Sequence, residues 1–137
     1  MIIKQLSVFV ENESGRVASI VSSLGKSGID ISALSLADTM DFGIMRMIVD
    51  KPEVAMETLK QEGIIYKLTD VLAVALDDQP GGLATVLEVL STEDYAVNYM
   101  YAFMSRSHGA VMVLSVDDTE SAMALLMGKG FTSGNIK

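Results

Sequence analysis

The fold is decided by two stretches of the sequence, VFVENESGRVA at residues 8–18 and VALDDQPGGLA at residues 74–84, which align position by position. The first stretch ends a run, residues 3–10, that alternates as in a β-strand with Leu6, Val8 and Val10 on one face, and the second ends an expected strand at 71–77. A polar loop follows each strand. A glycine then opens a segment whose apolar residues recur with helical spacing. These glycines, Gly15 and Gly81, are 66 residues apart. The chain therefore contains an internal repeat.

The repeat extends through most of the chain. After one inserted residue the offset becomes 67, so that Gly63 corresponds to Gly130. Two copies of about 66 residues nearly fill the 137 residues. A length prior of about 150 residues per domain would predict one domain, but the repeat predicts two, at 1–69 and 70–137. No flexible linker is visible between them.

Each copy has the periodicities of a βαββαβ unit. Asp50 is expected to cap the second helix of the first copy, and the spacing recurs at Asp117. The expected strands are 3–10, 29–37, 44–49 and 64–69 in the first copy, and 71–77, 97–104, 110–116 and 131–136 in the second.

The predicted fold class is α+β, with two tandem ferredoxin-like domains. In such a unit an antiparallel sheet carries both helices on one face. The second strands, 29–37 and 96–104, are apolar on both faces, although a half-covered sheet should be polar on its other face. We therefore expect these strands to pair edge to edge, because unpaired apolar edges are hazardous. We also expect a second chain to cover the free sheet face, giving a homodimer.

Composition limits the function classes. The chain has 10 Lys and Arg against 18 Asp and Glu, a formal net charge of −8. This sign disfavours nucleic acid and anionic membranes as partners. Without cysteine and with one histidine, the chain lacks the side chains for disulfides, zinc–cysteine sites and multi-histidine metal sites. We expect no cofactor and no metal.

No targeting or membrane-spanning segment is visible in the hydropathy pattern. We therefore expect a cytoplasmic protein. The adjacent acids Asp77 and Asp78 lack further ligands, so a solvated turn is favoured over a metal site. His108 lies in a predicted turn without a positioned acid or nucleophile, which disfavours catalysis.

The two loops and the helices that follow them resemble those of ACT domains. The pattern is a strand, an acidic or amide residue three positions before a glycine, a helix, and a second strand beginning at Gly28-Ile29-Asp30-Ile31 in the first copy. The resemblance covers essentially the whole chain as a tandem pair. It implies small-molecule sensing: most family members bind an amino acid between two paired domains and regulate an enzyme.

Elementary chemistry agrees with such a site. Free backbone amides at a helix start bind a carboxylate, and glycine permits close approach. The ammonium group needs acceptors such as Asn12, Asp78 or Asn98. If the two second strands pair edge to edge, each helix start faces the second strand of the other copy. The candidate ligand-binding residues are Asn12, Glu13, Ser14, Gly15 and Arg16 with Val97, Asn98 and Tyr99, and Asp78, Gln79, Gly81, Gly82 and Leu83 with Asp30, Ile31 and Ser32.

Structural explanations stand beside these assignments. The glycines could serve only to start helices, and Asn12 and Asp78 only to form turns. Tyr99, Tyr101 and Phe103 are expected to form an interface core rather than a stacking platform for RNA. The two sites also differ, because Arg16 corresponds to Gly82 and Ser32 to Asn98.

Three functions remain open. The first is a stand-alone regulatory protein that binds an amino acid and is not an enzyme. The second is a regulatory subunit of an amino-acid biosynthetic enzyme, since Glu11-Asn12-Glu13-Ser14-Gly15 is similar to a loop of the acetohydroxyacid synthase small subunit. The third is an acylphosphatase-like enzyme, for which Arg16 is a lone candidate without a complete catalytic set. The doubled helix start favours the first.

Overall fold

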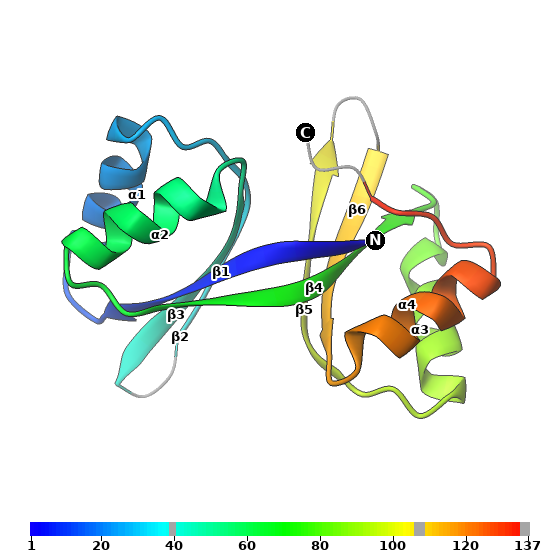
Figure 1. Ribbon diagram of the computed structural model, residues 1–137. Helices are drawn as coiled ribbons and strands as arrows, with labels where there is room; N and C mark the ends of the chain where they lie inside the picture. The colour runs from blue at the N-terminus through cyan, green and yellow to red at the C-terminus, as the bar shows by residue number, and fades with distance from the viewer. Residues whose placement is uncertain (39–40, 106–108, 135–137) are drawn as a thin grey trace. The chain divides into compact units, whose positions relative to one another are not determined.

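The protein is seen in a computed structural model that describes residues 1–38, 41–105 and 109–134. Strands and helices alternate along the chain and confirm the α+β fold class (Figure 1). Two compact units are present, one formed by Lys4–Thr69 and the other by Asp70–Lys137 with Met1–Ile3. The elements are β1 (Ile2–Glu11), α1 (Arg16–Lys26), β2 (Ile31–Asp38), β3 (Phe42–Val49), α2 (Pro52–Gln61), β4 (Tyr66–Leu76), α3 (Gly82–Thr92), β5 (Val97–Ser105), β6 (Gly109–Val116) and α4 (Thr119–Gly128).

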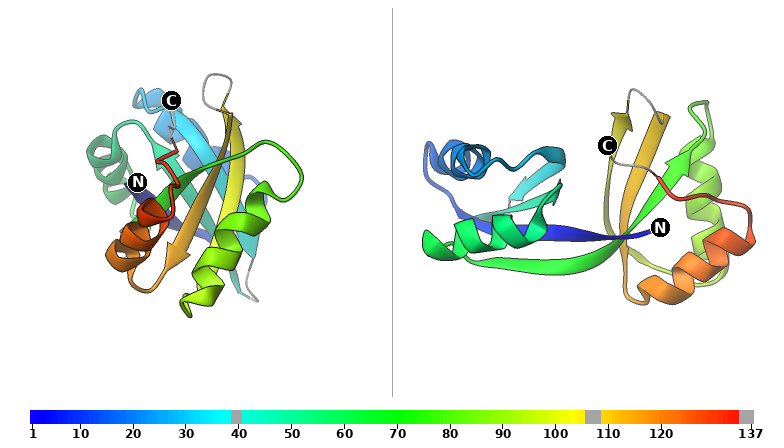
Figure 2. Two further views of the ribbon diagram at one scale, coloured as in Figure 1. Left: turned by 90° about the vertical axis from the view of Figure 1, so that its right-hand side faces the viewer. Right: turned by 45° about the horizontal axis from the view of Figure 1, so that its top comes forward.

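The Lys4–Thr69 unit is a sheet with α1 and α2 on one face (Figure 2). Its strand order is β2-β3-β1-β4, and β3 pairs antiparallel with both β1 and β2. Alternate residues of β1 point into the core because side chains of a strand alternate between faces. Leu24 and Leu59, from the two helices, are fully buried against them.

The second unit repeats this arrangement with β4-β6-β5 and the helices α3 and α4. Leu90 and Leu126 from these helices are fully buried in a separate core. The N-terminus contributes to this unit, because the Ala73 amide donates to the Met1 carbonyl oxygen at 2.8 Å. Each unit therefore has its own core, as two tandem domains require.

Two strands differ from the sequence-based expectation. Residues 64–69 and 71–77 were predicted to be separate strands, but Tyr66–Leu76 is one continuous strand, β4. No glycine or proline interrupts this stretch, so nothing forces a turn. The strand predicted at 131–136 is reduced to a bridge between Ser133 and Val74, and residues 135 and 136 lie outside the described ranges.

The predicted pairing of β2 with β5 is wrong within one chain. The strand order is β2-β3-β1-β4-β6-β5, so these two strands lie at its opposite ends. The unbroken strand β4 is the last strand of the first unit and the first strand of the second. Across the described residues, no helix has the length and apolar character needed to span a membrane.

Candidate functional site

The loop between β1 and α1 is fixed by short backbone hydrogen bonds. The Glu13 amide donates to the Glu11 carbonyl oxygen at 2.8 Å, and the Arg16 amide donates to the Glu13 carbonyl oxygen at 3.2 Å. Gly15 then takes the left-handed conformation, with φ of 81°, at the N-cap of α1. Glycine adopts this conformation without the steric strain that a side chain would bring. The loop is thus a tight turn that ends directly at the helix.

The loop between β4 and α3 has the same geometry. The Gln79 amide donates to the Asp77 carbonyl oxygen at 2.9 Å, and the Gly82 amide donates to the Gln79 carbonyl oxygen at 3.0 Å. Gly81 has φ of 89° and takes the N-cap position of α3. The sequence offset of 66 residues therefore corresponds to a repeated hydrogen-bond pattern.

Both helices begin with uncompensated amides. At α1, the amides of Val17 and Ala18 have no hydrogen-bond partner among the residues the structure describes, and the same holds for Leu83 and Ala84 at α3. Neither N-cap residue supplies a side-chain hydrogen bond, and neither first turn contains an acid. By contrast, the first turns of α2 and α4 contain acidic residues. The starts of α1 and α3 are therefore suited to bind an anion.

Gly82 has a structural explanation. A Cβ at this position would lie 2.1 Å from the Asp77 carbonyl oxygen, much closer than any ordinary contact. The loop before α3 therefore excludes every side chain at this position. At the equivalent position in the first copy the backbone accommodates Arg16. This difference removes a cation from the second helix start.

A cavity of about 430 Å³ lies beside the start of α1, within the Lys4–Thr69 unit. Its volume is in the range of about 300–1,000 Å³ typical of small-molecule sites. The rings of Phe9 and Phe42 meet edge to face with their centroids 5.6 Å apart. The described lining consists of Phe9, Val10, Glu11, Arg16, Phe42, Gly63, Ile64 and Ile65.

Arg16 is half-buried in the lining of this cavity. Its Nε atom is buried and has no hydrogen-bond partner in the described part of the chain. A buried donor without a partner costs about 1–3 kcal/mol, so a partner at this atom is expected. A bound carboxylate would supply one.

An equivalent cavity of about 280 Å³ lies beside α3 in the second unit. Most of its lining follows from that of the first by the offsets of 66 and 67, but the chemistry changes. Ala75 replaces Phe9, and Thr132 replaces Ile65. The described lining is Ala75, Asp77, Gly82, Thr85, Lys129, Gly130, Phe131 and Thr132.

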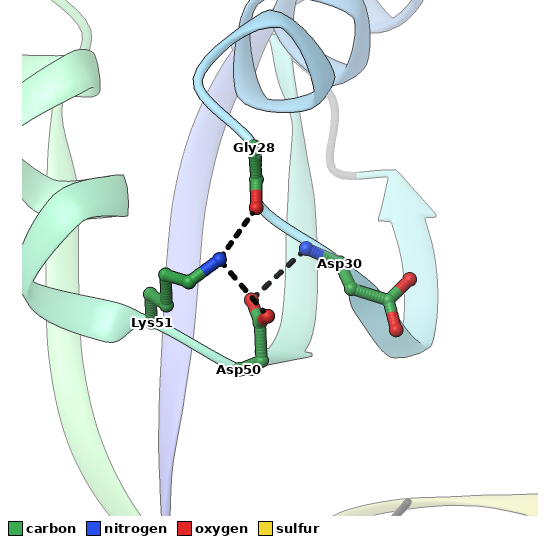
Figure 3. A network of polar contacts seen from close by, with 4 residues as sticks. All are labelled: Gly28, Asp30, Asp50 and Lys51. Atoms are coloured by element: carbon green, nitrogen blue, oxygen red, sulfur yellow. Dashed lines mark hydrogen bonds and ion pairs between the residues drawn. The ribbon is translucent and has the colours of Figure 1, made fainter.

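The second strand of the first copy is anchored at its start by Asp50 (Figure 3). The Asp30 amide donates to Asp50 Oδ1 at 2.9 Å, and Lys51 Nζ lies 3.4 Å from Asp50 Oδ2. The hydrogen bond, and to a smaller extent Lys51, lower the pKa of Asp50. Lys51 Nζ also donates to the Gly28 carbonyl oxygen at 2.8 Å. The prediction that Asp50 caps α2 is therefore wrong: Lys51 is the N-cap residue, and the Asp50 carboxylate holds the start of β2.

Both second strands contain a bulge at a candidate residue. The register shifts between Ile31 and Ala33, and again between Val97 and Tyr99. The extra residues are Ser32 and Asn98. Asn98 Nδ2 donates to Asp117 Oδ1 at 3.0 Å, so Asp117 holds the start of β5 as Asp50 holds the start of β2. Asp118, one residue later, is the N-cap of α4 and accepts the Ser121 amide.

The structure thus groups the candidate residues into four places. Asn12, Glu13, Ser14, Gly15 and Arg16 lie at the start of α1, and Asp78, Gln79, Gly81, Gly82 and Leu83 at the start of α3. Asp30, Ile31 and Ser32 lie at the start of β2, and Val97, Asn98 and Tyr99 at the start of β5. That a helix start and a second strand of the other copy form one site stays a prediction.

Sequence reasoning missed the apolar lining of the first cavity. Phe9, Phe42 and Ile65 are 39%, 38% and 69% exposed, respectively, although apolar side chains usually avoid such exposure when they gather. The repeat offered a signal for this lining, because the residues that follow Gly63 and Gly130 correspond in sequence and line the two cavities. No group of three or more acidic or histidine side chains in the described ranges is arranged to hold a metal ion.

Residues 1–132 match the sequence profile of the ACT domain pair. The chain belongs to this family. A similar solved structure is protein BT0572 from Bacteroides thetaiotaomicron, with a TM-score of 0.89, 36% identity, and coverage of 97% of this chain and 93% of that one. This agreement confirms the tandem arrangement expected from the repeat and the ACT fold expected from the resemblance.

Two further similar proteins are subunits of enzymes. The aspartate kinase regulatory subunit from Thermus thermophilus shares the fold, with a TM-score of 0.64, 14% identity, and coverage of 95% of this chain and 97% of that one. The small subunit of acetolactate synthase isozyme 3 from Escherichia coli strain K12 is 33% identical over 72 residues. That match covers 51% of this chain and 43% of the subunit, so the chain spans less than half of this relative.

Proposed function

We propose that this ACT domain pair is a non-catalytic regulatory protein that senses an amino acid, with ACT domains at residues 1–69 and 70–137. The observation that carries the proposal is the pair of helix starts with free amides and no acid in the first turn. A carboxylate at these amides would satisfy donors that the free protein leaves unpaired. The regulatory subunit and the small subunit among the similar proteins support the role.

In this proposal the protein is cytoplasmic. Each ligand binds between the two domains. A helix start holds the carboxylate, and the bulged start of a second strand supplies acceptors for the ammonium group. The side chains at the bulges, Ser32 and Asn98, differ, so the two sites are expected to bind with different affinities.

The proposal is tested by thermal unfolding of the full chain against the twenty common amino acids. A ligand at 100 times its Kd should stabilise the chain by about 2.7 kcal/mol, which raises the Tm by several degrees. Ala18→Glu places a carboxylate beside the free amides of α1 and should compete with the ligand. Ser22→Glu, at an exposed position farther along α1, is the matched control. No shift with any amino acid would refute the proposal.

The relation to the acetolactate (acetohydroxyacid) synthase small subunit favours a second candidate, in which the chain regulates such an enzyme as a bound subunit. Affinity capture of the tagged chain from extract of its own cells should then recover the enzyme. Addition of the purified chain should change that enzyme's response to an amino acid. Capture that yields no synthase subunit would reject this candidate.

Self-association also belongs to the proposal, as a homodimer formed through the sheet. Leu34 and Leu36 on β2 are 44% and 53% exposed, and Met100 and Met104 on β5 are 42% and 64% exposed. These strands end the strand order, so their apolar side chains lack a neighbouring strand on one side. Sedimentation equilibrium should give the mass of a dimer, and a monomer across micromolar concentrations would exclude it.

A further inference from the structure

We propose that the 430 Å³ cavity beside α1 selects an amino acid with an apolar side chain, and that the chain has one such site. This inference rests on the proposed function, because it names the class of amino acid that the first helix start would hold. Two observations support it: the residues that line the first cavity, and the absence of several of their counterparts from the second cavity.

Arg16 supplies the carboxylate end of the site. It is the first residue of α1, where a cation is disfavoured by the positive end of the helix dipole. Its Nε is also buried without a partner in the described ranges. A ligand carboxylate satisfies this donor and offsets both positive charges, because guanidinium and carboxylate form strong charge-assisted hydrogen bonds.

Glu11 supplies one further acceptor for the ammonium group, in addition to those that the proposed function assigns to a second strand. It is the last residue of β1, is exposed, and lines the same cavity as Arg16. A plain carboxylate would be repelled by Glu11, whereas a zwitterion presents one charge to each of these residues. The pair therefore favours an α-amino acid over the 2-oxo acid with the same side chain.

The rest of the lining determines the side chain of the ligand. Phe9, Phe42, Ile64 and Ile65 surround the cavity, and Glu11 and Arg16 carry the only charged groups of its described lining. A polar ligand side chain would lose its hydrogen bonds with water here without gaining partners. An apolar side chain gains about 0.8 kcal/mol for each buried methylene, which corresponds to a factor of about four in Kd.

The second copy has lost these features. Gly82 removes the guanidinium, and the clash with Asp77 prevents any side chain from restoring it. Ala75 and Thr132 replace an aromatic and an aliphatic residue, and the cavity falls to about 280 Å³. One apolar amino acid per chain is therefore expected.

The test is isothermal titration calorimetry of the full chain with L-leucine, L-phenylalanine, L-aspartate, L-lysine and 4-methyl-2-oxopentanoate. Leucine or phenylalanine should bind at one per chain, and at least tenfold tighter than the other three compounds. Arg16→Gln should weaken that binding by about 10- to 100-fold, as expected for loss of a charge-assisted hydrogen bond.

A matched pair of exposed substitutions isolates the apolar lining. Ile65→Thr copies the second cavity at a residue that is 69% exposed, so folding is retained, and it should weaken binding about fourfold. Val54→Thr makes the same kind of change on α2, at a residue 41% exposed and outside the lining, and should leave Kd unchanged.

The outcomes separate this inference from the proposed function. Tighter binding of aspartate or lysine would overturn the inference while the amino-acid sensor stands. Equal binding of the oxo acid would overturn the role of Glu11. Equal effects of Ile65→Thr and Val54→Thr would overturn the cavity as the site. If none of the twenty amino acids stabilises the chain in the thermal screen, the proposed function itself fails.

Discussion

Replacement of Gly82 by alanine should destabilise the protein, although alanine is the better helix former. The new Cβ would lie 2.1 Å from the Asp77 carbonyl oxygen, and ordinary contact, at about 3.5 Å, requires a retreat of more than 1 Å. Overpacking of this kind costs about 1–3 kcal/mol. The same carbonyl oxygen accepts the Gln79 amide at 2.9 Å, and disturbing that bond adds about 0.5–1.5 kcal/mol.

The better helix propensity of alanine offsets about 0.5–1 kcal/mol of this cost. A net loss of about 0.5–4 kcal/mol follows, which lowers the Tm by about 1–16 °C for a chain of this size. Differential scanning calorimetry measures it directly. Arg16→Ala is the matched control, because that position already holds a Cβ and the change also removes a buried Nε atom without a partner in the described part of the chain, so the Tm should not fall. A Tm for Gly82→Ala within 1 °C of the parent would refute the argument.

Three further predictions concern stability in the absence of ligand. Ala18→Glu and Ala84→Glu should each raise the free energy of unfolding by about 0.3–1 kcal/mol, because each places an acid in a first turn that lacks one, and urea denaturation at low salt measures the gain. Asp50→Asn should lower the Tm at neutral pH. Because the folded-state pKa of Asp50 is lowered, its contribution is present above the unfolded pKa and is lost as pH falls through the folded pKa, so the Tm values of parent and variant should converge in acid. Leu59→Ala should cost about 2–5 kcal/mol, because Leu59 is fully buried between α2 and its sheet, and a loss below 1 kcal/mol in urea denaturation would contradict this core.

The fold could be predicted because the same sequence pattern occurs in both copies of the repeat. The helical spacing after Gly15 and Gly81 and the strand-forming residues before them are local signals, and they recur at one offset. The continuity of β4 could not be predicted, because one strand that ends the first unit and begins the second contains the same strand-forming residues as two separate strands would.

The site could be predicted only in part. The helix starts were visible because glycine and turn residues mark them. The bulges at Ser32 and Asn98 were not, since an extra residue in one strand depends on the partner strand. Asp50 has a sequence typical of a helix cap, yet its carboxylate holds the Asp30 amide, 20 residues away. Such a choice between partners is made by tertiary packing.

The most direct test of the central claim is a ¹H–¹⁵N titration of the full chain with the amino acid that raises its Tm most. The backbone amides of Val17 and Ala18 should shift strongly as they gain an acceptor, and more than those of Leu83 and Ala84. Binding that shifts neither pair of amides would show that the helix starts do not hold the ligand and would contradict the account.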